Sequence, residues 1–242
     1  MGDREWELNA HWWRDGFTDG ADPEYTEQLI PLLVEHTAAG SLVVDVGCGE
    51  GQVARALASG RGCEVIGVDR SPAQLRTAMQ RGGPPSYALG DAGALPLGSA
   101  VADVAVACLV LEHTEDLDAV LGEAARVLRP GGRLLVLINH PIVQTPGSGW
   151  VDDHIVDPPE QYWQLGWYLD TTTTVEEVDP GVFITFHHRT LAEYLNCARG
   201  HGLVLGHMDE PAPPPGFIAK APEYTEQARM PRVMFMRLER LS

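Results

Sequence analysis

The sequence predicts an α/β fold, with a parallel β-sheet that carries helices on both of its faces. Two observations predict it. From residue 41 to residue 139, short apolar runs typical of buried strands alternate with segments of helical periodicity. The first run leads into a helix through a glycine-rich turn at residues 47–51. A chain of 242 residues suits one such domain with an insertion and is short for two, so we expect a single domain over residues 1–242.

The expected strands of this series are short apolar runs, which is typical of strands covered on both faces. In chain order they lie at Leu42–Val46, Glu64–Val68, Ser86–Leu89, within Val101–Val110, and at Arg133–Ile138. In parallel sheets with helices on both faces, ligands bind at the carboxyl ends of the strands. The loops that follow the first four strands are therefore where we expect a cofactor.

The helices between these strands are indicated by end signals and by apolar side chains at helical spacing. We expect them at Gln52–Ser59, from Pro72 to about Arg81, and at Leu117–Leu128. Ser71 is a good N-cap, and Pro72 suits the first helical position. Gly82 is expected to end the second helix, and the run Pro130-Gly131-Gly132 is expected to stop the third.

Two segments lie outside this regular series. Residues 1–40 carry several aromatic residues among many charges, with a helix expected over Glu24–His36, and we interpret them as N-terminal lid helices. Residues 140–182 are rich in proline, glycine, aromatic residues, aspartate and threonine, and they interrupt the alternation. A loop this long in a compact domain is usually functional, so we interpret it as an inserted cap that contacts the substrate.

The alternation resumes after this insertion. Val182–His187 predicts a strand, and Thr190 with Glu193 forms a capping-box pattern that predicts a helix to about Gly200. The last two strands are expected at Leu203–Met208 and Arg232–Leu238.

Composition excludes several classes of function. The formal net charge of −17 repels nucleic-acid phosphates and anionic lipid, so neither is an expected partner, whereas a cationic substrate would be attracted. The chain begins without the apolar core of a signal peptide, and no run approaches the roughly 20 apolar residues of a membrane-spanning helix. The four cysteines are scattered, which predicts reduced thiols in the cytoplasm and no metal site.

The glycine-rich turn carries the strongest functional signal. Its glycines let the backbone approach a ligand, and the helix behind it offers unpaired N–H groups. The dinucleotide fingerprint would need a third glycine at Gln52, but the third glycine is Gly51, one residue early. Asp45, at the end of the strand, disfavours an anionic diphosphate and suits a ligand with cationic groups.

Two further acidic residues end the next strands. Asp69 follows the second strand, where a carboxylate can accept hydrogen bonds from both hydroxyls of a ribose, although dinucleotide-binding enzymes use the same device. Asp91 follows the third strand, where it can accept from the amino group of an adenine. Alternatively, Asp91 simply forms an Asx-turn.

In this order and spacing, these three segments resemble those of class I S-adenosylmethionine (SAM)-dependent methyltransferases. Asp103–His113 and Val127–Leu134 are similar to the next two segments of that family, and the match runs from about Ser41 to Asn139. The resemblance implies a Rossmann-like, mostly parallel sheet of seven strands in the order 3-2-1-4-5-7-6, with one antiparallel strand and an inserted cap. It also implies SAM as the cofactor.

The resemblance assigns a part of SAM to individual residues. Asp45, Gly47, Cys48 and Gly49 would face the methionine end, Asp69 the ribose, and Asp91 with Ala92 the adenine, with Arg70 beside it, and Leu109 and His113 would lie under the cofactor. For His113, a purely structural role is the alternative.

The methyl acceptor is expected to be a small, partly apolar molecule such as a phenol or an amine, methylated on oxygen or nitrogen, with carbon as a further option. A hydroxyl acceptor must lose a proton, and histidine titrates in the right range. His140 and His188 are the candidate bases, since His140-Pro141 after the fifth strand and His188-Arg189 before a helix resemble the small-molecule, type-11 branch of the family. Either histidine could instead be structural.

The acceptor pocket is expected to draw on aromatic and polar residues of the two irregular segments and the strand that follows. These candidates are Trp13, Trp163, Trp167, Tyr168, His187 and Arg189. The alternatives are that the aromatic residues form the cap's own core, that His187 faces solvent, and that Arg189 pairs with the acidic cap.

Two other functions remain open on the sequence. A SAM-binding member of the same fold without methyl transfer, such as a cyclase or a regulatory protein, would carry the same cofactor residues. An NAD(P)-dependent oxidoreductase would show the same succession of a strand, a glycine-rich turn, a helix and an acidic residue after the second strand. The position of Gly51 and the loop at Asp91-Ala92 argue against this function.

Overall fold

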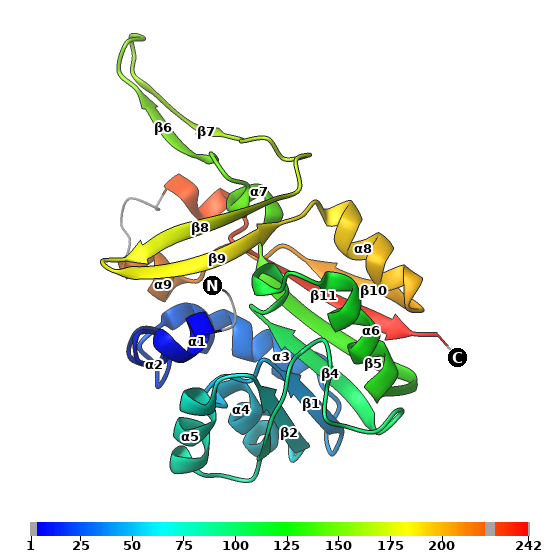
Figure 1. Ribbon diagram of the computed structural model, residues 1–242. Helices are drawn as coiled ribbons and strands as arrows, with labels where there is room; N and C mark the ends of the chain where they lie inside the picture. The colour runs from blue at the N-terminus through cyan, green and yellow to red at the C-terminus, as the bar shows by residue number, and fades with distance from the viewer. Residues whose placement is uncertain (1–3, 221–225, 242) are drawn as a thin grey trace.

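A seven-stranded sheet forms the centre of the computed structural model, which describes residues 4–220 and 226–241 (Figure 1). Its order is β10-β11-β5-β4-β1-β2-β3, with β11 antiparallel to both of its neighbours and the other strands parallel to one another. The strands are β1 (Leu42–Val46), β2 (Glu64–Asp69), β3 (Ser86–Leu89), β4 (Ala102–Cys108), β5 (Leu128–Asn139), β10 (Leu203–Asp209) and β11 (Val233–Arg240). The predicted fold class, strand order and single antiparallel strand are confirmed.

The two faces of the sheet bury different side chains, as strand alternation requires. Val44 and Val46 of β1 join a core cluster with helices α6 (Leu117–Val127) and α8 (Leu191–Gly200). Val43, the residue before Val44, points to the opposite face and joins a second cluster with the helices at 25–36 and 52–61. This burial on both faces is why the strands read as continuous apolar runs.

The helices begin where their caps predict. Helix α4 (Gln52–Arg61) follows the glycine turn, and α5 (Pro72–Arg81) starts after Ser71, whose side chain accepts a hydrogen bond from the Gln74 N–H. Helix α8 opens with a complete capping box formed by Thr190 and Glu193. The sequence therefore predicted both local caps correctly.

The end of α6 differs from the prediction. The helix ends at Val127, and the backbone turns extended at Leu128, so the Pro-Gly-Gly run is part of β5 and does not stop the helix. A Cβ on Gly132 would lie 2.9 Å from the Arg129 carbonyl oxygen and 3.0 Å from that of Asp103. The run therefore allows a close approach of two backbones at the start of β5.

The N-terminal segment is helical, as expected, but in several pieces. These are α1 (Glu5–Leu8), α2 (Ala10–Phe17), the π-helical turn η2 (Tyr25–Leu29) and α3 (Ile30–His36). The π-turn precedes Pro31, which has no N–H to donate and whose ring would clash with the carbonyl four residues back in a regular helix. A wider turn there lets the chain stay helical through the proline.

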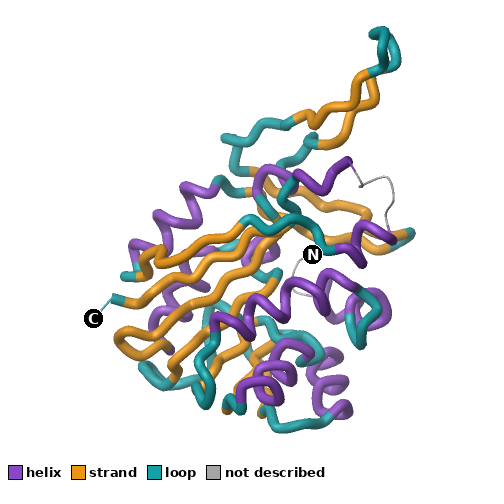
Figure 2. The backbone as a smooth tube through the Cα atoms, turned by 180° about the vertical axis from the view of Figure 1, so that it is seen from behind, coloured by secondary structure: helices purple, strands orange, loops and turns teal. Residues whose placement is uncertain are grey.

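The inserted segment is built from two hairpins and a short helix. They comprise α7 (Pro141–Gln144), β6 (Gly149–Asp153), β7 (Glu160–Gln164), β8 (Thr172–Asp179) and β9 (Val182–His188). The predicted strand at Val182–His187 exists, but it pairs with β8 outside the main sheet. The β6–β7 hairpin extends away from the rest of the molecule (Figures 1 and 2). Whether this segment acts as a cap stays a prediction.

The remaining short elements connect these parts. They are the 3₁₀ turn η3 (Leu111–His113) after β4, helix α9 (Pro215–Lys220) and the 3₁₀ turn η5 (Glu226–Arg229). Within the described residues, no helix has both the length and the apolar character needed to cross a membrane.

Candidate functional site

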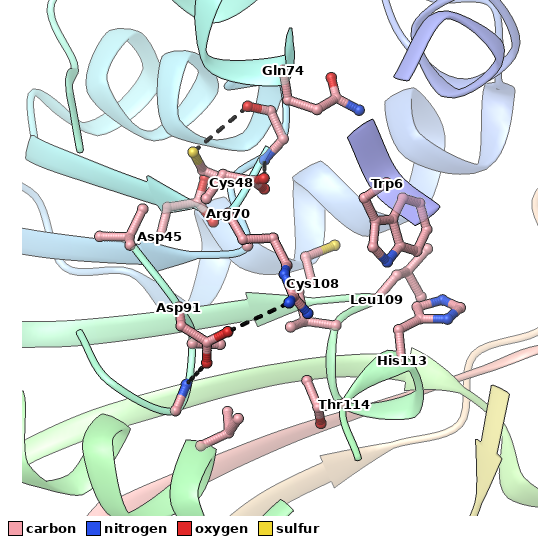
Figure 3. Close-up of a pocket in the computed structure, with 18 of the residues that line it drawn as sticks. Trp6, Asp45, Cys48, Arg70, Gln74, Asp91, Cys108, Leu109, His113 and Thr114 are labelled. Carbon is pink, nitrogen blue, oxygen red and sulfur yellow. Dashed lines mark hydrogen bonds and ion pairs between the residues drawn. The ribbon is translucent and has the colours of Figure 1, made fainter. Parts of the chain in front are cut away.

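A cavity of about 770 Å³ lies at the carboxyl ends of the parallel strands, where the loops after β1, β2, β3 and β4 meet (Figure 3). Every residue that the sequence assigned to the cofactor lines it. These residues are Asp45, Gly47, Cys48, Gly49, Asp69, Arg70, Asp91, Ala92, Leu109 and His113. The chain thus gathers residues from four separate loops around one space, as the carboxyl-edge rule predicts.

The glycine loop fits closely against its neighbours. Gly47, Gly49 and Gly51 have positive φ angles of 67°, 53° and 82°, which favour glycine. A Cβ at Gly47 would lie 2.6 Å from Val110 Cγ2, and one at Gly51 would run into the Tyr87 hydroxyl. The early third glycine is therefore explained by packing against Tyr87.

Asp45 is a buried carboxylate with unused hydrogen-bonding capacity. Its side chain is 2% exposed, and its Oδ2 atom has no hydrogen-bond partner. Burial is the largest cause that raises the pKa of Asp45, to about 8, and repulsion from the Asp69 carboxylate adds to it. A hydrogen bond from the Ala54 backbone N–H lowers the pKa but does not offset these two effects. A buried acid left in this state favours a cationic hydrogen-bond donor as its partner.

Asp69 is anchored by the backbone. Its Oδ2 accepts from the Gly49 N–H and its Oδ1 from the Ser71 N–H, both at 2.8 Å. Burial is the largest influence and raises the pKa of Asp69, while these two N–H groups lower it. Each oxygen keeps one lone pair, so the fixed carboxylate can still accept from two neighbouring hydroxyl groups.

Asp91 forms the Asx-turn that the sequence offered as the alternative. Its Oδ1 accepts from the Gly93 N–H at 2.8 Å, which fixes the loop after β3. Its Oδ2 lies 4.0 Å from Nη2 of Arg70, whose side chain extends across the cavity toward it (Figure 3). The turn and a ligand contact are compatible, because the carboxylate has further lone pairs.

The loop after β4 forms another wall of the cavity. Leu109 has a φ of 54°, an uncommon value for a residue other than glycine. The His113 Nδ1 lies 2.9 Å from the Thr185 carbonyl oxygen, and since that oxygen can only accept, Nδ1 carries the proton. The ring is also packed edge-on against Trp6, with centroids 5.0 Å apart. His113 therefore has a structural role at the same time as it faces the cavity.

The two candidate bases do not reach this cavity. His140 is buried, with Nε2 donating to Glu210 at 2.7 Å and Nδ1 accepting from the Ile142 N–H, so both of its nitrogens are engaged. His188 is buried as well, and its Nε2 donates to the Tyr168 carbonyl at 2.9 Å. The two histidines do not converge at the cavity, because Glu210 holds the His140 ring and the Tyr168 carbonyl holds the His188 ring.

The candidate acceptor residues divide into two groups. Trp13 and His187 line the cavity, and His187 is also partly exposed to solvent. Trp163 packs against Trp150 within the β6–β7 hairpin, and Trp167 is 83% exposed; neither lines the cavity. These aromatic residues belong to the projecting hairpin and its connection, which turns away from the site.

Tyr168 and Arg189 are held in polar networks away from the cavity. The Tyr168 hydroxyl accepts from the Leu191 N–H at 2.9 Å, at the start of α8. Arg189 is buried and donates to three backbone carbonyls of the loop after β4, which are those of Leu111, Thr114 and Glu115. Through these bonds Arg189 supports the loop after β4, which forms a wall of the cavity.

Several cavity residues were missed by sequence reasoning. Trp6 and Glu5 of α1 line it, together with Thr185 of β9. The Glu5 carboxylate accepts from the Thr185 N–H at 2.9 Å and from its hydroxyl at 2.7 Å. Residues 180 positions apart thus meet at the cavity. The one sequence signal for this contribution of the N-terminal segment is the number of aromatic residues in residues 1–40.

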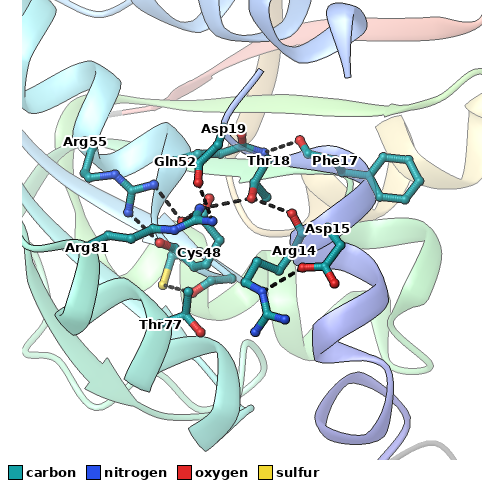
Figure 4. Close-up of polar contacts among 12 residues, drawn as sticks. Arg14, Asp15, Phe17, Thr18, Asp19, Cys48, Gln52, Arg55, Thr77 and Arg81 are labelled. Atoms are coloured by element: carbon teal, nitrogen blue, oxygen red, sulfur yellow. Dashed lines mark hydrogen bonds and ion pairs between the residues drawn. The ribbon is translucent and has the colours of Figure 1, made fainter. Parts of the chain in front are cut away.

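The N-terminal segment is tied to the glycine loop by a polar network (Figure 4). Arg81, at the end of α5, pairs with the buried Glu50 and with Asp19 at 2.7 Å, and donates to the Thr18 hydroxyl at 3.0 Å. Arg55 pairs with Glu50 from the other side at 2.6 Å. One buried acid therefore couples the cofactor loop to the segment that covers it.

Comparison with known proteins gives consistent results. Residues 44–136 match the family described as Methyltransferase domain. A stretch of 109 residues is 40% identical to the malonyl-[acyl-carrier protein] O-methyltransferase of Serratia marcescens, covering 45% of this chain and 42% of that protein. Another, of 110 residues, is 34% identical to the ubiquinone/menaquinone biosynthesis C-methyltransferase UbiE of Caulobacter vibrioides, covering 40% and 44%. The chain thus spans less than half the length of these two curated relatives.

The similarity of structure extends over more of the chain. A SAM-dependent methyltransferase from Mesorhizobium loti superposes with a TM-score of 0.74 at 26% sequence identity, covering 88% of this chain and 99% of that one. The match therefore includes the N-terminal helices or the insertion in part, beyond residues 44–136.

Proposed function

The chain belongs to the class I SAM-dependent methyltransferase family, and from this premise we propose that it transfers the methyl group of SAM to a small-molecule acceptor, on oxygen or nitrogen or alternatively on carbon. The observation that carries the proposal is the buried, unpartnered Asp45 oxygen on a cavity that also collects every other cofactor residue expected from the sequence. The O- and C-methyltransferases among the relatives support the same class of reaction.

The residues present fit SAM. The ligand has a cationic amino group, a ribose with two neighbouring hydroxyls, and an adenine. Asp45 offers an unpaired buried acceptor oxygen for the first, Asp69 has one spare lone pair on each oxygen for the second, and Asp91 with the Ala92 backbone suits the third. An anionic diphosphate would meet three carboxylates in the same space, which disfavours NAD(P).

When bound, SAM supplies an electrophilic methyl group on a sulfonium. The chain's own contribution is to orient an acceptor and to exclude water. Trp6 and His113 lie together on one side of the cavity, away from Asp91 (Figure 3). We infer that the acceptor binds on this side, against the Trp6 ring and the polar groups of β8 and β9 that also line the cavity.

The charge of the cavity favours an acceptor without negative charge. Among the described residues that line it, Arg70 is the one lysine or arginine, and it faces Asp91. The acidic lining residues are Glu5, Asp45, Glu50, Asp69, Asp91, Glu115 and Asp116. A neutral phenol or an amine is therefore a better acceptor than a phosphate or a carboxylate.

A hydroxyl or ammonium acceptor needs a base, and His187 is positioned for this role. Its ring lines the cavity, and its Nδ1 lies 3.0 Å from the Thr173 hydroxyl. With the Nδ1–H donating to that oxygen, Nε2 keeps a free lone pair. Burial, and then the nearby Arg189 cation, lowers the pKa of His187, which keeps the ring neutral near pH 7. His140 and His188 stay candidates from the sequence, but they lie outside the cavity.

An acceptor screen tests the proposal. The protein is incubated with SAM and a panel of phenols, amines and carboxylates, and both S-adenosylhomocysteine and the mass gain of one methylene unit in the acceptor are measured. We expect neutral phenols or amines to be methylated and Asp45→Asn to abolish the reaction. A chain that binds SAM but produces no S-adenosylhomocysteine with any acceptor would instead favour the cyclase or regulatory alternative.

We further propose that the protein acts in the cytoplasm, since its four cysteines are free thiols.

A further inference from the structure

Helices α6 and α8 lie side by side on one face of the sheet (Figure 1), and three potential metal ligands face each other across their contact. Asp118 comes from the first turn of α6, Cys197 from α8, and His201 is the C-cap residue of α8. The His201 Nε2 lies 2.9 Å from Asp118 Oδ1, and Cys197 Sγ lies 3.7 Å from the same oxygen. All three ligand atoms lie within 4.8 Å of one another.

The arrangement follows from helix geometry and from one small residue. Cys197 and His201 are four positions apart, which places both on the same side of α8. The His201 ring rests against Gly122 of α6, where an added Cβ would lie 3.1 Å from Cε1 and 3.3 Å from Nδ1. A Cβ at position 122 would require the imidazole to shift by a few tenths of an ångström, so the glycine allows the ring to pack closely with Nε2 directed at Asp118.

The spacing of the three atoms suits a tetrahedral metal ion. With metal–sulfur bonds of about 2.3 Å and metal–nitrogen or metal–oxygen bonds of about 2.0 Å, tetrahedral angles place neighbouring ligands roughly 3.3 to 3.6 Å apart. The two distances to Asp118 Oδ1, 2.9 Å from His201 Nε2 and 3.7 Å from Cys197 Sγ, lie on either side of this range. Thiolate, imidazole and carboxylate together form a donor set that zinc uses, and that hard ions such as Mg²⁺ do not.

We propose that Asp118, Cys197 and His201 form a site for a divalent metal ion of the zinc class, with a fourth position open to water. On binding, Cys197 Sγ releases its proton to solvent, and the imidazole proton moves from Nε2 to Nδ1 so that Nε2 can coordinate. The site adjoins a surface cavity whose described lining carries the carboxylates of Glu115, Asp116 and Glu193 against one guanidinium, that of Arg189, so that negative charge predominates there. The ion would tie α6 to α8 beside the catalytic cavity, and this proposal does not rest on the proposed function.

A second cluster of potential ligands serves as a comparison. His36, His207 and Asp209 also lie within 4.8 Å of one another, but Arg237 Nη1 lies 3.5 Å from His36 Nδ1. A guanidinium at that distance repels a metal ion and already occupies the ring nitrogen. This cluster also has no thiol, so a spectroscopic signal from a metal–sulfur bond distinguishes the two places.

The test is a titration of the whole EDTA-treated protein with Co²⁺, followed by its absorption spectrum. We expect one equivalent to bind, with an intense near-ultraviolet band from thiolate-to-cobalt charge transfer, and Zn²⁺ to displace the cobalt and remove the band. Cys197→Ser should lose the band entirely, and His201→Gln or Asp118→Asn should weaken Co²⁺ binding at least about tenfold. Cys63→Ser and His207→Gln are the matched controls and should behave as the wild type.

The variants also need a folding check, which thermal unfolding without metal provides. Zn²⁺ should raise the melting temperature of the wild type and of the two control variants, and it should not raise that of folded His201→Gln. Either of two results would overturn the proposal. One is a wild-type protein that develops no near-ultraviolet band with saturating Co²⁺, and the other is a band that survives in Cys197→Ser.

Discussion

At the scale of single residues, Asp45 connects the cofactor to the stability of the fold. Its pKa of about 8, raised by burial first, means that the folded chain holds a proton that the unfolded chain releases near pH 4. Between those two values the folded state binds more protons than the unfolded state, so this group makes the free energy of unfolding fall as pH rises. A cationic ligand reverses the preference, because it stabilises the charged form of the carboxylate.

Replacing this carboxylate therefore separates stability from binding. We expect Asp45→Asn, without ligand, to melt at a temperature at least about 2 °C above that of the wild type at pH 9, with a smaller difference at pH 5. The substitution removes the buried charge but keeps an acceptor oxygen for the Ala54 N–H. Thermal unfolding across this pH range measures the effect. A variant that is less stable than the wild type at pH 9 would contradict the assignment.

A second prediction at this scale concerns His187. If its Nε2 takes the proton of the acceptor, His187→Ala should lower kcat about 100-fold with the acceptor found by screening, with little change in KM or in SAM affinity. Because the pKa of His187 is lowered by burial, the wild-type rate should fall only below about pH 6.5. The variant should lose this acidic limb of the pH profile.

His188 provides the matched control for that experiment. His188→Ala removes a buried hydrogen bond to the Tyr168 carbonyl, so it should lower the melting temperature while largely preserving kcat. If the two variants show the opposite pattern, His188 is the base, as the sequence suggests, and the assignment of His187 as the base is wrong.

At the scale of elements, the sequence predicts best where the signal is local. The strand Leu42–Val46 is apolar except for Asp45 and matches β1 at both ends, and Ser71 caps α5 as a serine before proline should. The cofactor residues could be predicted for the same reason, since each lies at the carboxyl end of a strand or in the loop that follows it. Their gathering around one cavity then follows from the parallel sheet alone.

Contacts between residues far apart in the sequence could not be predicted from local sequence patterns. Nothing near Glu5 indicates that it would hold Thr185, and nothing near Trp163 indicates that its hairpin would turn away from the site. His188 directly follows His187, which lines the cavity, but the rings of His140 and His188 instead donate hydrogen bonds to Glu210 and to the Tyr168 carbonyl. The acceptor side of the cavity depends on such contacts, which is why only some of the residues predicted for it line the cavity.

The network around Glu50 predicts a role for the N-terminal helices in cofactor binding. Arg81→Met leaves the buried Glu50 with Arg55 alone and releases Asp19 and Thr18. We expect the variant to bind SAM about tenfold more weakly, with faster backbone hydrogen exchange in α2, because loss of one partner of a buried ion pair is costly. Arg76→Met is the control, since Arg76 is mostly exposed and its pair with Glu7 contributes at most about 1 kcal/mol.

The projecting hairpin predicts the opposite outcome. No described residue from 149 to 164 lines the cavity, so replacing this stretch by two glycines should leave SAM affinity within about twofold and the melting temperature nearly unchanged. Calorimetry and thermal unfolding measure both quantities. A hairpin deletion that abolishes SAM binding would mean that the segment closes onto the cavity in solution. An effect on the acceptor alone would identify the hairpin as part of acceptor recognition.

At the scale of the whole molecule, different parts of the chain form the floor of the cavity and its cover. The sheet and the helices at its faces place the cofactor loops along one edge, and β11 adds an antiparallel strand beside β5. The N-terminal helices and the β8–β9 hairpin then meet above that edge through the Glu5 contact with Thr185. The surplus of acidic residues, at a net charge of −17, extends into the cavity and selects against anionic ligands throughout.

The central claim is that this cavity binds SAM through its carboxylates, and calorimetric titration of the full chain tests it most directly. We predict micromolar binding of SAM and S-adenosylhomocysteine, at least about tenfold weaker binding of both by Asp45→Asn, and no binding of NAD(H). Because Asp45 must ionise to pair with the ligand's amino group, binding at pH 7 should also release protons, which titrations in two buffers measure. Tight NAD(H) binding without a response to SAM would contradict the account.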